Sequence, residues 1–290
     1  MSAATVGFRT EFQLGSMLRE RVAIALLLLP LIAWVIGDGG WLFGLGVTLV
    51  LSLAVSEFGL IFQHAGQRPA LPLLIAGVIL LSLSRFMFDF RLDAIILAGL
   101  ILLAMAWHAL DYEHGAVLSG TDFALTVAGL VYVGWIGAYF ISLRGMADGL
   151  WWFMIALPAV WAADSAAYLA GHRFGHHRLA PRLSPKKSTE GYVAGICGAA
   201  LAGWGLTLLW QIGAGPNSTL LPARGLLLGI VIGTVAPIGD LGISLFKRQL
   251  GIKDTGRLLP GHGGALDRID SWLWAGVIGY FLVQLMIGAI

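Results

Sequence analysis

The sequence has a single cysteine, Cys197, and few charged residues. One cysteine excludes an internal disulfide and any zinc site built from several cysteines. Asp, Glu, Lys and Arg make up only 12% of the 290 residues, about half of the roughly 25% found in soluble domains. So little charge excludes a soluble enzyme, a disordered chain and a disulfide scaffold. The abundant residues are apolar, at 58% of the chain, and the mean hydropathy is +0.84.

Long apolar runs follow one another along the chain. A membrane-spanning helix needs about 20 mostly apolar residues. We predict an all-α polytopic membrane protein with nine spans, near residues 20–37, 40–63, 70–88, 92–110, 121–143, 149–171, 191–213, 223–247 and 271–289. The whole chain is expected to form one integral membrane domain, with residues 1–148 as scaffold and 149–290 as the catalytic half.

The 40 glycines indicate closely packed helices. Gly-x-x-x-Gly motifs begin at Gly191, Gly225 and Gly229. Such motifs bring two helix backbones close together, either within one fold or between subunits.

The basic residues predict the orientation of the spans. With nine spans, 14 of the 18 Lys and Arg residues fall on the side of the N-terminus. The other side carries Arg85, Arg91, Arg144 and Arg224. Cytoplasmic loops are the ones enriched in basic residues. We therefore expect a protein of the cell (inner) membrane whose N-terminus and catalytic loops face the cytoplasm.

The most informative segment, residues 244–270, joins the last two predicted spans. Its basic cluster suits a polyanion such as a triphosphate, and the glycines near its end let the backbone approach a phosphate closely. Asp267 and Asp270 share one face of the last helix, and paired carboxylates there make a natural magnesium site. The alternative is a solvated cytoplasmic loop that follows the same charge rule.

Three carboxylates lie well inside predicted spans, away from the span ends: Asp240, Asp164 and Glu57. A mid-span Asp costs about 2.5–3.5 kcal/mol on insertion scales, so it is expected to face the protein interior or a wet cavity. Asp240 and Asp164 are candidate ligands, and pairing with a Lys or Arg is the alternative for each. Glu57 has no motif around it, which favours a structural or interfacial carboxylate.

A turn with the sequence Ser184-Pro-Lys186-Lys187 precedes the seventh predicted span. It presents two cations at the membrane surface, where lipid or nucleotide phosphate could bind. An ordinary electrostatic anchor to anionic lipid is the alternative. Glu190 could bind substrate or act in a capping box that begins at Lys187 or Ser188.

Together these residues resemble the signature of the phosphatidate cytidylyltransferase, or CDP-diacylglycerol synthase, family. The match runs from Ser244 through Lys253-Asp254 and His262-Gly-Gly to Asp267-Arg-Ile-Asp270. Gly239-Asp240-Leu and the Ser184-Pro-Lys-Lys turn also look like family motifs. Two positions depart from the pattern: Ala265 stands where a larger aliphatic residue is usual, and Ser188-Thr189 replaces the more familiar Thr followed by a bulky residue.

The resemblance implies transfer of CMP from CTP to phosphatidic acid, giving CDP-diacylglycerol and pyrophosphate. It also implies Mg²⁺, with room for a second metal ion, and a homodimer; no nucleic-acid partner is expected. The metal candidates are Asp240 and Asp267, followed by Asp270 and Asp164. The catalytic candidates are Lys247, Arg248, Lys253, Asp254, His262 and Arg268. The substrate-binding candidates are Ser184, Lys186, Lys187, Glu190, Ser244, Gly263 and Gly264.

Two further readings stay open at this point. One is a cytidylyltransferase or kinase that acts on another membrane lipid. The other is a secondary transporter of an anionic substrate, since intramembrane aspartates and glycine-broken helices also occur there. Transporters often have paired halves, whereas here the polar motifs fall in one half.

Overall fold

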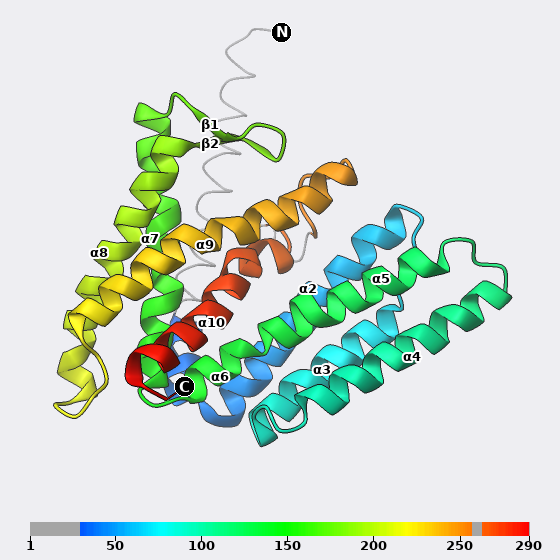
Figure 1. Ribbon diagram of the computed structural model, residues 1–290, viewed down its shortest axis with the longest axis horizontal. Coiled ribbons are helices and arrows are strands. Elements are labelled where there is room, and N and C mark those ends of the chain that lie inside the picture. Colours follow the sequence, from blue (N-terminus) through cyan, green and yellow to red (C-terminus); the bar gives the residue numbers. More distant parts are fainter. Residues whose placement is uncertain (1–29, 257–262, 290) are drawn as a thin grey trace, which may run out of the picture.

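The computed structural model describes residues 30–256 and 263–289. It is almost entirely helical, as the sequence predicts, and Figure 1 shows the arrangement. Residues 30–38 are helical, and the elements that follow are α2 (Gly40–His64), α3 (Leu71–Phe88), α4 (Asp93–Glu113), α5 (Ser119–Gly129), η1 (Leu130–Trp135), α6 (Tyr139–Gly145), α7 (Gly149–Phe174), β1 (Arg178–Ala180), β2 (Ser184–Ser188), α8 (Thr189–Ala214), α9 (Pro222–Gln249) and α10 (Leu266–Ile287).

Eight helical segments of the described chain are long and apolar enough to cross a membrane. They match the second to ninth predicted spans, and α5, η1 and α6 together form a single one over Ser119–Gly145. Most of the first predicted span, residues 20–37, lies outside the described residues. The described part therefore confirms an all-α polytopic membrane protein.

Helix α10 lies between two groups of helices. Figure 1 shows α7, α8 and α9 on one side of it and α2 to α5 on the other. The fully buried side chains of Leu51, Val78, Leu130 and Leu273 belong to α2, α3, η1 and α10, so one apolar core joins these elements. As a result α10, which carries two of the candidate aspartates, contacts both halves of the chain.

The Gly-x-x-x-Gly motifs pack helices within this fold. A Cβ at Gly229 would overlap the carbonyl oxygen of Ala199 on α8, and one at Gly225 would overlap Thr207. A Cβ at Gly191 would lie 2.7 Å from the carbonyl oxygen of Ala167 on α7. Helices α7, α8 and α9 therefore touch backbone to backbone, which fixes their relative positions.

A buried ion pair connects the end of α3 to the start of α4. Arg85 pairs with Asp93, and its guanidinium also donates to Ser142 Oγ at 3.0 Å. Trp135 Nε1 donates to the Asp93 carboxylate at 2.9 Å. Both charges of the Arg85–Asp93 pair thus have partners, and the pair can be buried against η1 and α6.

Candidate active site

The candidate aspartates come together where α9 crosses α10. A Cβ at Gly239 on α9 would overlap the carbonyl oxygen of Asp270 on α10, so the two backbones are in contact there. The next residue on α9 is Asp240. Asp270 is 7% exposed, and its carboxylate interacts electrostatically with Asp240 and Asp267. Asp240, which lies 27 positions before Asp267 in the sequence, thus shares one site with the two aspartates of α10.

Lysines neutralise two of these carboxylates. Lys187 Nζ on β2 lies 2.6 Å from Asp240 Oδ2, and Lys247 Nζ on α9 lies 2.8 Å from Asp267 Oδ1. Asp164 on α7 interacts electrostatically with both Lys187 and Asp240. The site is therefore a row of acidic and basic groups drawn from α7, β2, α9 and α10.

Asp267 is held more firmly than a single ion pair would hold it. Its Oδ2 accepts from the backbone N–H of Thr255 at 2.8 Å, from the Thr255 hydroxyl at 3.0 Å and from the N–H of Gly264 at 3.2 Å. Its side chain is 8% exposed. The loop between α9 and α10 thus fixes the direction of this carboxylate.

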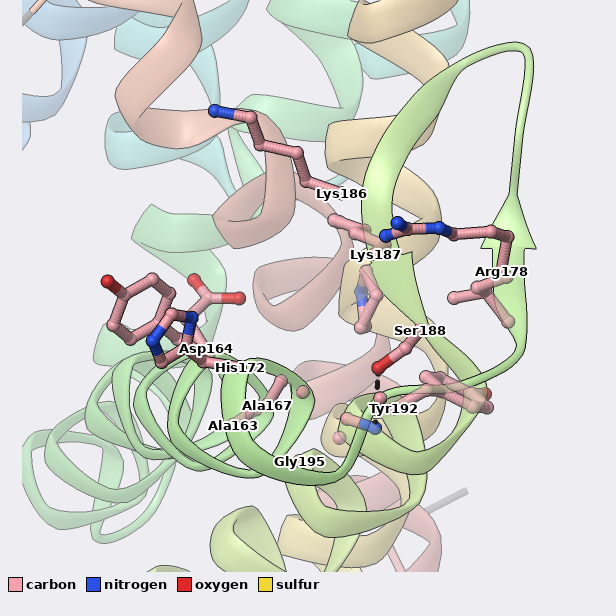
Figure 2. Close-up of a pocket in the computed structure, with 17 residues that line it drawn as sticks. Ala163, Asp164, Ala167, His172, Arg178, Lys186, Lys187, Ser188, Tyr192 and Gly195 are labelled. Carbon is pink, nitrogen blue, oxygen red and sulfur yellow. Dashed lines mark hydrogen bonds between the residues drawn. The ribbon is translucent and has the colours of Figure 1, made fainter.

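A cavity of about 630 Å³ opens beside this row, between α7, the β1–β2 hairpin, α8 and α9. Figure 2 shows Asp164 and His172 on one side of it, Arg178 on the other and Lys187 between them. Small residues such as Ala163 and Gly195 line the floor. The cavity combines cationic groups with apolar walls, which suits a lipid that carries a phosphate.

The β1–β2 hairpin is fastened at its base. Ser188 is the N-cap of α8, and its side chain accepts from the N–H of Gly191 at 3.1 Å. Glu190 accepts from the N–H groups of His176 and His177, and its Oε1 lies 2.6 Å from His177 Nδ1. The structure therefore places Glu190 against the hairpin rather than in a capping box.

Two predicted residues connect α9 to its surroundings. Ser244 is buried, and its hydroxyl lies 3.5 Å from Asp240 Oδ1. Arg248 Nε donates to the carbonyl oxygen of Leu183 at 3.1 Å, which ties the end of α9 to the hairpin. Arg248 thus helps to hold the hairpin beside the site.

Two further predicted residues lie on β2. Ser184 is half-buried at the start of β2, and Lys186 is exposed.

The remaining predicted residues lie along the loop after α9 and in the first turn of α10. Lys253, Asp254 and Arg268 are exposed. Gly263 has a φ of 80°, and a Cβ there would lie 3.7 Å from Asp254 Oδ1 and 3.8 Å from Arg268 Nη2. A glycine is favoured at this φ because L side chains rarely adopt it. His262 and Arg257 lie outside the described residues.

Comparison with known proteins identifies the family. The model of the cytidylyltransferase family matches residues 19–286. The chain belongs to the cytidylyltransferase family. It is similar to the phosphatidate cytidylyltransferase of Synechocystis sp., with 31% identity over 86% of this chain and 90% of that protein. The enzyme of the same name from Brucella suis is 36% identical over 91% of this chain and 93% of its own length. The resemblance in the signature segment is thereby confirmed.

The residues of this cytidylyltransferase fit a magnesium ion in their chemistry. Mg²⁺ takes oxygen ligands and is usually bound by one or two carboxylates together with substrate phosphates. Asp240, Asp267 and Asp270 could supply those carboxylates, with Asp164 further along the row. Within residues 30–256 and 263–289, no three His, Cys, Asp or Glu side chains are grouped closely enough to form a complete metal site. With one or two carboxylates from the protein, the remaining ligands of Mg²⁺ would be substrate phosphate oxygens and water.

Sequence reasoning missed the roles of three residues around this site. Glu57 on α2 contacts the loop that holds Asp267, and Thr255 lies between the two carboxylates. Tyr132, on the π-helix η1, accepts a hydrogen bond from Trp274 Nε1 at 3.0 Å and interacts electrostatically with Asp270. The only signal for Glu57 was a lone carboxylate in an apolar run, and nothing in the sequence marks Tyr132.

Proposed function

We propose that this chain transfers the cytidylyl group of CTP to phosphatidic acid, forming CDP-diacylglycerol and pyrophosphate. The observation that carries the proposal is the row of aspartates and lysines beside a cavity with cationic and apolar walls. Membership of the cytidylyltransferase family and similarity to proteins named phosphatidate cytidylyltransferase support it.

The reaction needs positioning and charge neutralisation more than a strong base. An oxygen of the lipid phosphate attacks the α-phosphorus of CTP, and the bond from that phosphorus to the oxygen bridging the β-phosphate breaks. The nucleophile is already anionic, so no proton has to be removed first. Pyrophosphate leaves with the electron pair of the broken bond.

Each group of residues has a part in this scheme. Lys187 lines the cavity and would meet the phosphate of the lipid. Lys247, with Arg248, Lys253 and Arg268 nearby in the sequence, would stabilise the charge of the departing pyrophosphate. Mg²⁺, when bound, would act as a Lewis acid on the phosphate oxygens. Asp240, Asp267 and Asp270 would hold it, and Mg²⁺ dependence is part of the proposal.

We further propose that the site faces the cytoplasm and that the protein works as a homodimer. The cytoplasmic orientation is supported by the distribution of basic residues. The availability of CTP on that side agrees with it. A homodimer is supported by the family resemblance alone.

Purified protein in detergent, supplied with phosphatidic acid and Mg²⁺, tests the proposal with CTP labelled at two positions. Label at the α-phosphorus should enter the lipid, whereas label at the γ-phosphorus should leave as pyrophosphate. Lipid labelled from the γ-position would indicate a kinase instead. Uptake of an anion into vesicles without a labelled lipid would indicate a transporter. A prenyl phosphate offered in place of phosphatidic acid tests the lipid class.

A further inference from the structure

Glu57 is the only Asp, Glu, Lys or Arg in the sequence of residues 40–64, which form the otherwise apolar helix α2. Its side chain points into the protein, and the residue is 8% exposed. An ionisable group buried in a membrane helix is costly, so its partners indicate its role. Those partners lie in the signature segment, about 200 residues later.

The Glu57 carboxylate caps the last helix. Its Oε2 accepts from the N–H of Leu266, the first residue of α10, at 2.9 Å. The first N–H groups of a helix have no partner inside the helix, and a negative charge there is favourable. Ala265, at the N-cap position, has no side-chain oxygen that could do this. Glu57, which lies on helix α2, therefore takes the place of a local N-cap side chain.

Two glycines of the loop allow the backbone to close around this carboxylate. A Cβ at Gly256 would overlap Glu57 Oε1, and a Cβ at Gly264 would overlap Glu57 Oε2. In this structure the backbone of Gly264 thus lies close to the Glu57 carboxylate and the Thr255 hydroxyl. Its predicted contact with a substrate phosphate stays a prediction.

Thr255 connects this carboxylate to the site. Its hydroxyl lies 3.2 Å from Glu57 Oε2 and 3.0 Å from Asp267 Oδ2, while its N–H donates to Asp267. We infer that Glu57 is a positioning residue for cytidylyl transfer, because it fixes Thr255 and the start of α10 and thereby the direction of Asp267. This inference rests on the proposed function.

The charge of Glu57 is expected to matter as much as its shape. Hydrogen bonds to an ionised acceptor are roughly twice as strong as those between neutral groups. Glu57→Gln keeps the size of the side chain and one carbonyl acceptor but removes the charge. Partners that orient a metal ligand typically contribute about 10- to 100-fold to metal affinity or activity. We therefore expect a loss of that size in kcat, with a higher Mg²⁺ concentration for half-maximal rate.

The kinetic test compares Glu57→Gln with Ser56→Ala at a temperature well below the melting temperatures of both. Ser56 is on the same helix, and its hydroxyl donates to the carbonyl oxygen of Leu53 within that helix, so Ser56→Ala should behave as the unsubstituted protein. A purely structural role would lower the melting temperature and leave kcat and the Mg²⁺ dependence of the folded enzyme unchanged. That result would overturn the inference.

Hydrogen–deuterium exchange without substrates tests the contact itself. In Glu57→Gln, peptides that contain Thr255 or Leu266 should exchange faster, and peptides from α8 should not change. Unchanged exchange at Thr255 and Leu266 would also overturn the inference. If the unsubstituted protein makes no labelled lipid, the proposed function fails and takes this inference with it. If it does make labelled lipid and Glu57→Gln equals it, only the inference fails.

Thr255→Val provides a second route should Glu57→Gln fold poorly. The substitution removes the bridging hydroxyl at nearly constant volume. If Glu57 and Thr255 act through one network, the double variant should be scarcely less active than the worse single variant. Losses that multiply in the double variant would show that the two residues act separately, against the inference.

Discussion

Lys187 on β2 and Asp240 on α9 form an ion pair of 2.6 Å that joins the β1–β2 hairpin to the middle of a membrane helix. Both lysines of this turn line the cavity, but Lys187 is half-buried in this ion pair, whereas its neighbour Lys186 is exposed. The two lysines of the Ser-Pro-Lys-Lys turn, which look equivalent in the sequence, therefore have different surroundings.

We expect Lys187→Met to reduce transfer by about 10-fold or more, the size of effect seen when a partner of a metal ligand is lost. Lys186→Met should cost less, since no carboxylate in the described part of the chain is paired with Lys186 in an ion pair. Initial rates across CTP and phosphatidic acid concentrations measure both variants. Equal losses in the two would show that the Lys187–Asp240 pair has no special part in the reaction.

Asp240 and Asp267 should act as one unit. Asn at either position keeps the size and a carbonyl oxygen but removes the charge that Mg²⁺ prefers. Each single variant should lose activity by roughly 100-fold, as when a group that stabilises developing charge is removed. The double variant should be scarcely worse than either single one.

The assay for these variants is α-label transfer across a Mg²⁺ titration, with folding followed by thermal melting in detergent. The matched control is Arg144→Ala, on the other predicted side of the membrane. Arg144 donates to the carbonyl oxygens of Ile36 and Gly37, so this change should lower the melting temperature and spare the transfer. Near-normal activity of Asp267→Asn at limiting Mg²⁺ would mean that the metal lies elsewhere.

The orientation can be tested with single cysteines in a Cys197→Ala background. A cysteine at Gln249, at the end of α9, should be shielded from an impermeant thiol reagent in intact cells. A cysteine at Asn217, in the exposed turn between α8 and α9, should react. The opposite labelling pattern would reverse the topology, and with it the proposed cytoplasmic site.

Helix packing gives a prediction on stability. In Gly229→Ala the new methyl group would overlap the carbonyl oxygen of Ala199. Such overpacking typically costs about 1–3 kcal/mol, so the melting temperature should fall. Gly205→Ala, on α8, meets no atom within 4 Å. This control should be neutral or slightly stabilising, since Ala favours a helix over Gly by about 1 kcal/mol. Equal melting temperatures would show that α8 and α9 are not in close contact.

The spans could be predicted from the sequence because hydropathy alone determines them. The eighth predicted span, 223–247, lies within α9, but the ninth was placed five residues late, at 271 instead of 266. The polar residues Asp267, Arg268 and Asp270 interrupt the apolar run, so the hydropathy pattern starts the span after them, although Asp267 and Asp270 are expected on the last helix. The π-helix η1 could not be predicted, since its residues are as apolar as those of an ordinary helix.

The sequence marks candidate residues in several separate segments but does not show how they pair. The signature segment contains Asp267 and Lys247, and the structure pairs them. The pairing of Lys187 with Asp240 and the contact of Glu57 with Leu266 form only after helices pack. Charge pairing was foreseen as an alternative for Asp240, but a single sequence does not reveal the partner.

The contact between Glu57 and Leu266 has a consequence for how the protein is made. The two residues are 209 positions apart, and ribosomes add about 5–20 residues per second. Helix α2 is therefore synthesised roughly 10–40 s before the residue that its carboxylate caps. During this interval Glu57 lacks both of its partners in the signature segment, the N–H of Leu266 and the hydroxyl of Thr255. Insertion of the final helix completes the site, so a nascent chain that lacks α10 should be inactive as well as incomplete.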